Sequence, residues 1–173
     1  LGQPALRRYE DGQFPTPGGK ARFFARAWSE GELSNYGIGH LVEGNISYNA
    51  KKGTLRGMHF QQAPHGQAKL VRCTKGGILD VIIDLRRDSP TFQQWLTVEL
   101  TAQNHLMLYV PIDFAHGFQT LEDDTEITYQ VSSPYHPESS SGVRWNDPAF
   151  GIPWPDGERV IIARDREYPD WKV

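Results

Sequence analysis

The sequence contains a single cysteine, Cys73, among its 173 residues, so no disulfide can form within the chain. We therefore expect a protein of a reducing compartment, the cytoplasm. No apolar run approaches the roughly 20 residues that span a bilayer, and the N-terminal residues lack the apolar core of a signal peptide. The net charge is −3 and the basic residues are scattered, which predicts neither a nucleic-acid partner nor a membrane-binding patch.

Several signatures of catalysis are also missing. The six histidines include no His-x-His pair and form no cluster with the cysteine, so their spacing predicts no metal site. The Gly-x-Ser-x-Gly signature of serine hydrolases is absent, as are glycine-rich loops of the Walker and dinucleotide-binding types. Acid–base chemistry by ordinary side chains, without a cofactor, remains open.

The pattern of apolar residues favours strands. Apolar residues make up 38% of the chain, enough for a core, and 17 glycines and 12 prolines interrupt it at short intervals. We expect seven strands, at residues 53–61, 67–74, 78–86, 95–101, 105–111, 116–122 and 125–132. Short strands at this spacing predict an all-β sandwich or barrel, and we treat residues 1–173 as one domain.

The connections carry weaker signals. Gly76-Gly77 separates two expected strands and predicts a tight hairpin, and residues 111–114 predict a turn with its proline at a strand end. Ser29 can cap a short helical turn. The tail at residues 146–171 is rich in proline and tryptophan, so we expect it to wrap around the barrel.

Alternation along the strands sorts the side chains into two faces. Tyr129 falls on the apolar face of segment 125–132, where it is either a core tyrosine or an acid that faces a cavity. Lys69 falls in line with Val71 and Cys73, so it is either an edge lysine that reaches water or a charge inside the barrel.

The stretch GTLRGMHFQ, residues 53–61, holds a histidine among apolar residues. Strict alternation places Arg56 and His59 on opposite faces, and they share a pocket only if the strand bulges. Gly57, between them, is where a bulge costs least.

These residues suit proton abstraction beside a carbonyl. His59 has the pKa class of a general base near neutral pH, and Tyr129 is a candidate acid. Lys69 and Arg56 can stabilise a negative oxygen, and a carboxylate such as Asp165 or Asp84 can orient the imidazole.

Four stretches in this order resemble the dTDP-4-dehydrorhamnose 3,5-epimerase family: GTLRGMHFQ, KLVRCTKGGILDVIIDLRRDSPTF, LYVPIDFAHGFQTLEDDTEITYQV and GVRWNDPAFGIPWP. The likeness extends from about residue 45 to 165. It implies a cupin-type jelly-roll barrel with short peripheral helices that works as a homodimer, without metal or cofactor. It also implies a nucleotide-linked 4-keto-6-deoxyhexose as substrate, epimerised at C3, C5 or both for deoxysugar biosynthesis.

The resemblance also implies roles for individual residues. The base falls on His59, the acid on Tyr129 and the support of the enolate on Lys69. The carboxylate paired with the base falls on Asp165, with Asp84 as the fallback. The implied substrate-binding residues are Arg56, His116, Tyr135, Arg164 and Phe24, and we add Arg22, with Arg26 as the alternative, as a replacement for a phosphate contact that the family pattern supplies.

The sequence departs from the family pattern near its N-terminus. The family commonly has Asp-x-Arg-Gly-Phe-Phe-x-Glu, where this chain has GKARFFAR. The expected arginine falls on Ala21, with Arg22 one place later, and the expected glutamate falls on Arg26. In the family this segment reaches across the dimer to hold the nucleotide, so the departure leaves the base and the sugar open. Ile162 and Ala163 also replace the usual serine and acid before ARDR.

Other interpretations compete with a 3,5-epimerase. A mono-epimerase at C3 or C5, or an epimerase for a different nucleotide sugar, would use the same acid–base residues. A sugar-nucleotide binding module that has lost catalysis predicts damage at His59, Lys69 or Tyr129, and all three are intact. A metal-dependent cupin enzyme, such as an oxygenase, is a further alternative.

Overall fold

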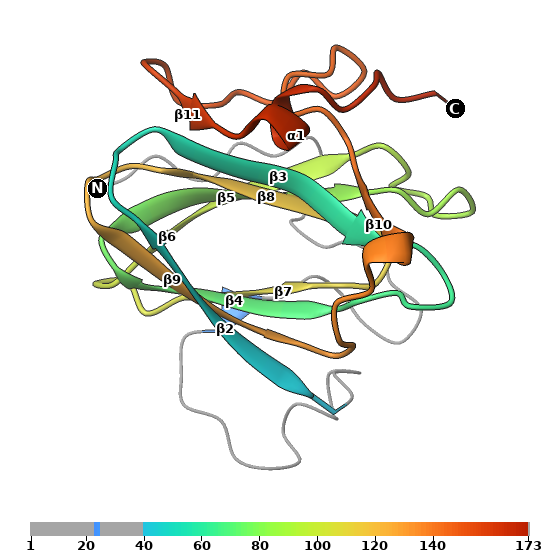
Figure 1. Ribbon diagram of the computed structural model, residues 1–173, viewed down its shortest axis with the longest axis horizontal. Coiled ribbons are helices and arrows are strands. Elements are labelled where there is room, and N and C mark those ends of the chain that lie inside the picture. The colour runs from blue at the N-terminus through green and yellow to red at the C-terminus, as the bar shows by residue number, and fades with distance from the viewer. Residues whose placement is uncertain (1–22, 25–39, 173) are drawn as a thin grey trace.

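The structure is a computed structural model that describes residues 23–24 and 40–172. Two sheets lie face to face, and the C-terminal segments lie over the outer side of one of them (Figure 1). The first sheet has the order β1-β7-β4-β9-β2 and the second the order β10-β3-β8-β5-β6, with β11 pairing with β3. The strands are β1 (Phe23–Phe24), β2 (Glu43–Asn49), β3 (Thr54–Gln61), β4 (Lys69–Lys75), β5 (Gly77–Asp84), β6 (Trp95–Thr101), β7 (Met107–Val110), β8 (Phe114–Thr120), β9 (Thr125–Val131), β10 (Ser140–Gly142) and β11 (Val160–Ile161).

The predicted all-β fold is confirmed, and the seven expected strands are β3 to β9. Among the described residues, the short helices are a 3₁₀ turn, η2 (Pro137–Ser139), and α1 (Ala163–Arg166). Within the described residues, no helix combines the length and the apolar character needed to cross a membrane. The turn expected at Ser29 lies outside the residues that the structure describes.

The hairpin predicted at Gly76-Gly77 is wrong. β4 pairs with β7 and β9 in the first sheet, whereas β5 pairs with β6 and β8 in the second. Both edges of β4 are therefore occupied, and the glycines carry the chain from one sheet to the other. Gly76 has φ +75, and a Cβ there would lie 2.5 Å from Oγ1 of Thr125, so only glycine fits this crossover.

The second sheet is buried on both faces. Its inner face packs between the sheets, where Ile78 and Ile82 of β5 join the core with Leu108 and Ile127 of the first sheet. Each fully buried side chain of this kind contributes roughly 1.5–3 kcal/mol. The outer face packs against the C-terminal tail in a second cluster, which contains Leu55, Met58, Val81, Ile83, Trp95, Val143, Phe150 and Trp154. The tail therefore covers the barrel, as its composition predicts.

Candidate active site

A cavity of ≈ 380 Å³ lies within the barrel, lined by strands of both sheets and by two segments at its mouth. The seven candidate residues on its wall are Arg56, His59, Lys69, His116, Tyr129, Tyr135 and Arg164. β2 contributes polar side chains that the sequence analysis did not single out, namely Glu43, Asn45 and Ser47.

A bulge in β3 turns two of these residues toward the cavity. Arg56 pairs with Phe118 of β8 and His59 pairs with His116, so three steps on β3 match two steps on β8. The bulge on which a shared pocket for Arg56 and His59 depends is therefore present. Gly57 has φ +118, and a Cβ there would lie 2.6 Å from Cα of Gly117, so the close approach of the two strands requires glycine.

His59 is hydrogen-bonded to Asp165, which α1 supplies from the C-terminal tail. Nε2 of His59 lies 2.7 Å from Oδ1 of Asp165. The other oxygen, Oδ2, accepts a hydrogen bond of 3.0 Å from the backbone N–H of Gly57. Arg164 donates to Oδ1 from Nε at 3.2 Å. The Asp165 side chain is fully buried, so these contacts fix its position.

The fallback partner, Asp84, lies elsewhere. It accepts hydrogen bonds of 2.6 Å from Nη2 of Arg86 and from the hydroxyls of Ser89 and Thr91. Of the two carboxylates considered, the structure therefore brings Asp165 to His59 and keeps Asp84 in a separate network.

The electrostatics suit a neutral base beside an ionised carboxylate. Burial lowers the pKa of His59, and the contact with Asp165 opposes this only in part. Burial alone would raise the pKa of Asp165, but the hydrogen bonds from His59 and Gly57 lower it below its ordinary value. An ionised carboxylate only accepts hydrogen bonds, so the proton lies on Nε2 of His59 and Nδ1 carries the lone pair.

Lys69 and Tyr129 enter the cavity from the first sheet, opposite His59. Burial lowers the pKa of Lys69 to about 8, although the charge of Asp80 opposes the shift. Burial, with the charge of Glu43, raises the pKa of Tyr129, so its hydroxyl keeps its proton at neutral pH. Alternation along the strands left two positions open for each residue, and the structure places both side chains on the cavity wall.

A second histidine–carboxylate pair lies beside the first. Nε2 of His116 is 2.6 Å from Oδ1 of Asp80, and both side chains are buried. The sequence analysis did not assign a role to Asp80. The sequence feature that could have identified Asp80 is its position inside the apolar run ILDVII. A charge buried there is costly unless it has a partner.

The N-terminal candidates are placed only in part. The backbone of Phe24 lies on β1, where it pairs with Met107 of β7. Arg22 lies outside the described residues, together with Ala21 and Arg26 of the segment that departs from the family pattern.

Comparisons with known proteins agree on one family. A family model described as dTDP-4-dehydrorhamnose 3,5-epimerase matches residues 16–172. A relative of that description from Sinorhizobium fredii is 47% identical over 147 residues, which are 84% of this chain and 74% of the relative. The two proteins therefore share most of their length.

Solved structures show the same fold. The dTDP-4-dehydrorhamnose 3,5-epimerase of Bacillus anthracis, with TDP and PPi bound, has a TM-score of 0.81 and 38% identity, and the match covers 97% of this chain and 100% of that one. A 3′-monoepimerase from Streptomyces bikiniensis in complex with dTDP-quinovose has a TM-score of 0.76 and 32% identity, covering 87% and 80%. These likenesses confirm the jelly-roll fold class.

Proposed function

Because this chain belongs to the dTDP-4-dehydrorhamnose 3,5-epimerase family, we propose that it epimerises a nucleotide-linked 4-keto-6-deoxyhexose in deoxysugar biosynthesis. The relatives that match it carry this activity in their descriptions, and two matching structures contain TDP or a dTDP-sugar. One observation carries the proposal for this chain: His59, paired with buried Asp165, shares a cavity with Lys69 and Tyr129.

In the proposed mechanism, His59 removes a proton from a carbon next to the 4-keto group. The ketone acidifies the C3 and C5 protons because the resulting charge moves to its oxygen. Nδ1 of His59 accepts the proton, and the carboxylate of Asp165 on Nε2 stabilises the imidazolium that forms. Such positioned proton transfer contributes about 10²–10⁴-fold to the rate.

Lys69 is the proposed partner of the enolate oxygen. A cation held in a cavity that excludes most water interacts with a developing negative charge more strongly than it does in bulk water. Removal of one such donor typically costs about 2.7–4 kcal/mol of transition-state stabilisation. The lowered pKa of Lys69, about 8, fits a charge that lacks a full counter-ion until the enolate forms.

Tyr129 is the proposed acid that returns a proton to the opposite face of the sugar. β3, which carries His59, and β9, which carries Tyr129, belong to opposite sheets, and both side chains line one cavity. A ring between the sheets therefore presents one face to each residue. Removal of the proton on one face and return on the other inverts the carbon.

The remaining candidates are proposed to hold the substrate. Arg56 and His116 on the cavity wall suit the diphosphate or the sugar. Arg164 and Tyr135, whose side chains are largely exposed at the mouth, suit the phosphates and the nucleotide. We further propose that Phe24 and Arg22 contact the nucleotide of a partner subunit.

We propose that the enzyme is a homodimer formed through β2. This strand is the last in its sheet, and Val42, Ile46 and Tyr48 on and beside it are 54%, 71% and 57% exposed. An uncovered edge strand with apolar side chains favours pairing with a second chain. Ile46→Lys should therefore lower the mass measured by sedimentation from that of a dimer to that of a monomer. The buried free thiol of Cys73 fits the cytoplasmic location that we also propose.

The function is tested by incubating the protein with dTDP-4-keto-6-deoxyglucose in deuterated water and following label at C3 and C5 by NMR. We expect exchange at one or both carbons with wild-type protein and with His105→Ala, which alters an exposed histidine. His59→Ala should abolish exchange, whereas Tyr129→Phe should allow exchange but impair inversion. Label at C3 alone or C5 alone identifies a mono-epimerase. Absence of exchange with the wild type refutes the proposal for this substrate, and exchange at the wild-type rate in His59→Ala removes His59 from the role of base.

A further inference from the structure

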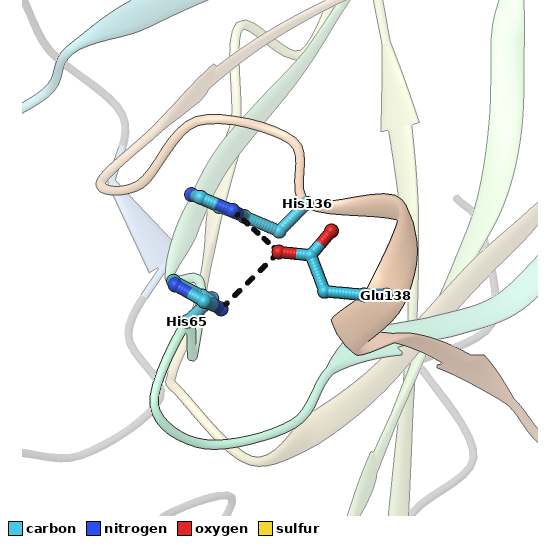
Figure 2. A group of neighbouring side chains, drawn as sticks. All are labelled: His65, His136 and Glu138. Atoms are coloured by element: carbon cyan, nitrogen blue, oxygen red, sulfur yellow. Dashed lines mark hydrogen bonds and ion pairs between the residues drawn. The ribbon is translucent and has the colours of Figure 1, made fainter.

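Three possible metal ligands meet near the mouth of the barrel, although 71 positions separate His65 from His136. His65 lies in the segment between β3 and β4, and His136 and Glu138 lie in the segment that leads to β10. Nδ1 of His136 is 3.0 Å and Nδ1 of His65 is 3.9 Å from Oε1 of Glu138. Figure 2 shows both imidazoles beside this one carboxylate oxygen.

The backbone on which these side chains stand is held by Gln61 at the end of β3. Its buried carboxamide donates from Nε2 to the carbonyl oxygens of His65, at 2.9 Å, and Pro134, at 3.1 Å. Its Oε1 accepts a hydrogen bond of 2.6 Å from the N–H of His136. One buried side chain therefore bridges the two segments and holds the backbone of His65 close to that of His136.

We propose that His65, His136 and Glu138 bind a divalent transition-metal ion of the zinc, cobalt or nickel class. All three ligand atoms lie within 4.8 Å of one another, the span that a single ion can bridge after small side-chain movements. Two imidazole nitrogens and one carboxylate oxygen suit these ions, whereas magnesium and calcium favour oxygen ligands alone. The histidine side chains are 32–33% exposed and the glutamate 64%, so an ion can enter from solvent.

Ion binding requires changes at both histidines. The rings of His65 and His136 are stacked, with centroids 3.6 Å apart and planes inclined by 9°. A ligand nitrogen directs its lone pair along the plane of its ring, so two parallel stacked rings cannot both point at one ion. His136 must rotate out of the stack, while Nδ1 of His65 must exchange its 2.9 Å hydrogen bond with the Ser139 hydroxyl for the ion. Binding of an ion by both rings would therefore separate the stacked pair.

This site is distinct from the catalytic cavity but adjoins it. Its three side chains are absent from the cavity wall. The wall does include Gln61, which is hydrogen-bonded to the backbone of His65, and Tyr135, which precedes His136 in the chain. A bound ion would cross-link the segment that follows Gln61 to the segment that carries Tyr135.

The test uses protein without a histidine tag, freed of metal by a chelator that is then removed by dialysis. Co²⁺ is titrated and followed by its visible absorption, and equilibrium dialysis with Zn²⁺ counts bound ions. We expect one ion per chain for the wild type and for His105→Ala, the matched control at an exposed histidine. His136→Ala and Glu138→Gln should each weaken binding by at least about tenfold, since loss of even a group that supports a ligand costs 10–100-fold.

The readouts separate the proposed site from the alternatives. Melting temperatures of the ion-free variants within a few degrees of the wild type show that they fold, and Glu138→Gln preserves size if His136→Ala does not fold. The histidine NMR signals that move on addition of Zn²⁺ should be those that His65→Ala and His136→Ala remove. Wild-type affinity in His136→Ala and Glu138→Gln, or loss of the ion in His59→Ala, would overturn the proposal.

Discussion

Replacing Lys69 by methionine removes one positive charge from the cavity and keeps a side chain of similar length. The pKa of Lys69 falls from 10.5 to about 8, mainly through burial. At 1.36 kcal/mol for each tenfold change in the equilibrium, this difference means that the cavity disfavours the ammonium by about 3 kcal/mol relative to the neutral amine. If an enolate beside Lys69 recovers this energy in the transition state, kcat/KM should fall by about 10²-fold in Lys69→Met.

The same substitution should stabilise the fold. Below pH 8 the folded and unfolded wild-type chains both carry the ammonium, so the whole unfavourable energy applies at pH 7. Between about pH 8 and 10.5 only the unfolded chain keeps the proton, so the stability of the wild type rises with pH in this range. Above pH 10.5 both states are neutral, and the unfavourable energy of the buried charge no longer contributes. Loss of the attraction to Asp80 offsets part of the gain in Lys69→Met. We therefore expect the free energy of unfolding at pH 7 to increase by up to about 3 kcal/mol in Lys69→Met. Each kcal/mol corresponds to a rise of about 2–4 °C in melting temperature.

Two assays check this pair of effects. The pH profile of kcat/KM should fall below pH 6.5 in both proteins, because His59 must be neutral and its pKa is lowered from 6.5. Only the wild type should also fall above about pH 8, where Lys69 loses its charge. Urea unfolding at pH 7 measures the stability, and Lys75→Met, at an exposed position of the same strand, is the control. A variant that is both active and unchanged in stability would refute the reasoning about Lys69.

Three further substitutions probe other parts of the molecule. Asp165→Asn should lower kcat by about 10²-fold or more, because the imidazolium of His59 loses its carboxylate; an unchanged kcat would exclude that role. Gly57→Ala should destabilise the fold by about 1–3 kcal/mol in thermal unfolding. Gly44→Ala is the control and should not destabilise it, because no atom lies within 4 Å of the added Cβ. Equal effects of the two substitutions would contradict the close packing of β3 on β8. Asp84→Asn should lower the free energy of unfolding by about 2–4 kcal/mol at pH 7. This loss should shrink as pH falls through the depressed pKa of Asp84, below 3.8, and a loss that stays constant in acid would contradict the ion pair with Arg86.

The strands that the sequence predicts are those with apolar side chains on an inward face. β2 was missed because its pattern is reversed: Ile46 and Tyr48 face outward and are exposed, while Asn45 and Ser47 line the cavity. Periodicity shows which residues share a face but not which face is buried. The hairpin predicted at Gly76-Gly77 is wrong because two consecutive strands can pair only if each has a free edge. Both edges of β4 are already paired, with β7 and with β9.

The candidate site shows a similar division. Local pattern made a shared pocket for Arg56 and His59 conditional on a bulge, with Gly57 as its easiest place, and the register of β3 against β8 contains that bulge. The contact of His59 with Asp165 joins residues 106 positions apart, and that of His116 with Asp80 joins β8 to β5 across 36 positions. Such contacts depend on the packing of whole sheets and of the tail, so spacing in the chain cannot reveal them. The cluster of His65, His136 and Glu138 was invisible for the same reason.

Asp165 belongs to the tail that covers the outer face of the second sheet, whereas His59, Lys69 and Tyr129 stand on barrel strands (Figure 1). The carboxylate that contacts the imidazole thus comes from a different stretch of the chain than the strands that form most of the chamber. Asp165 does not line the cavity, whereas its neighbour Arg164 does, so substitutions at Asp165 alone can alter the proton affinity of His59 and leave the space for the sugar unchanged. An enzyme engineer can therefore adjust the pH response of this scaffold at one tail position and its selectivity on the strands.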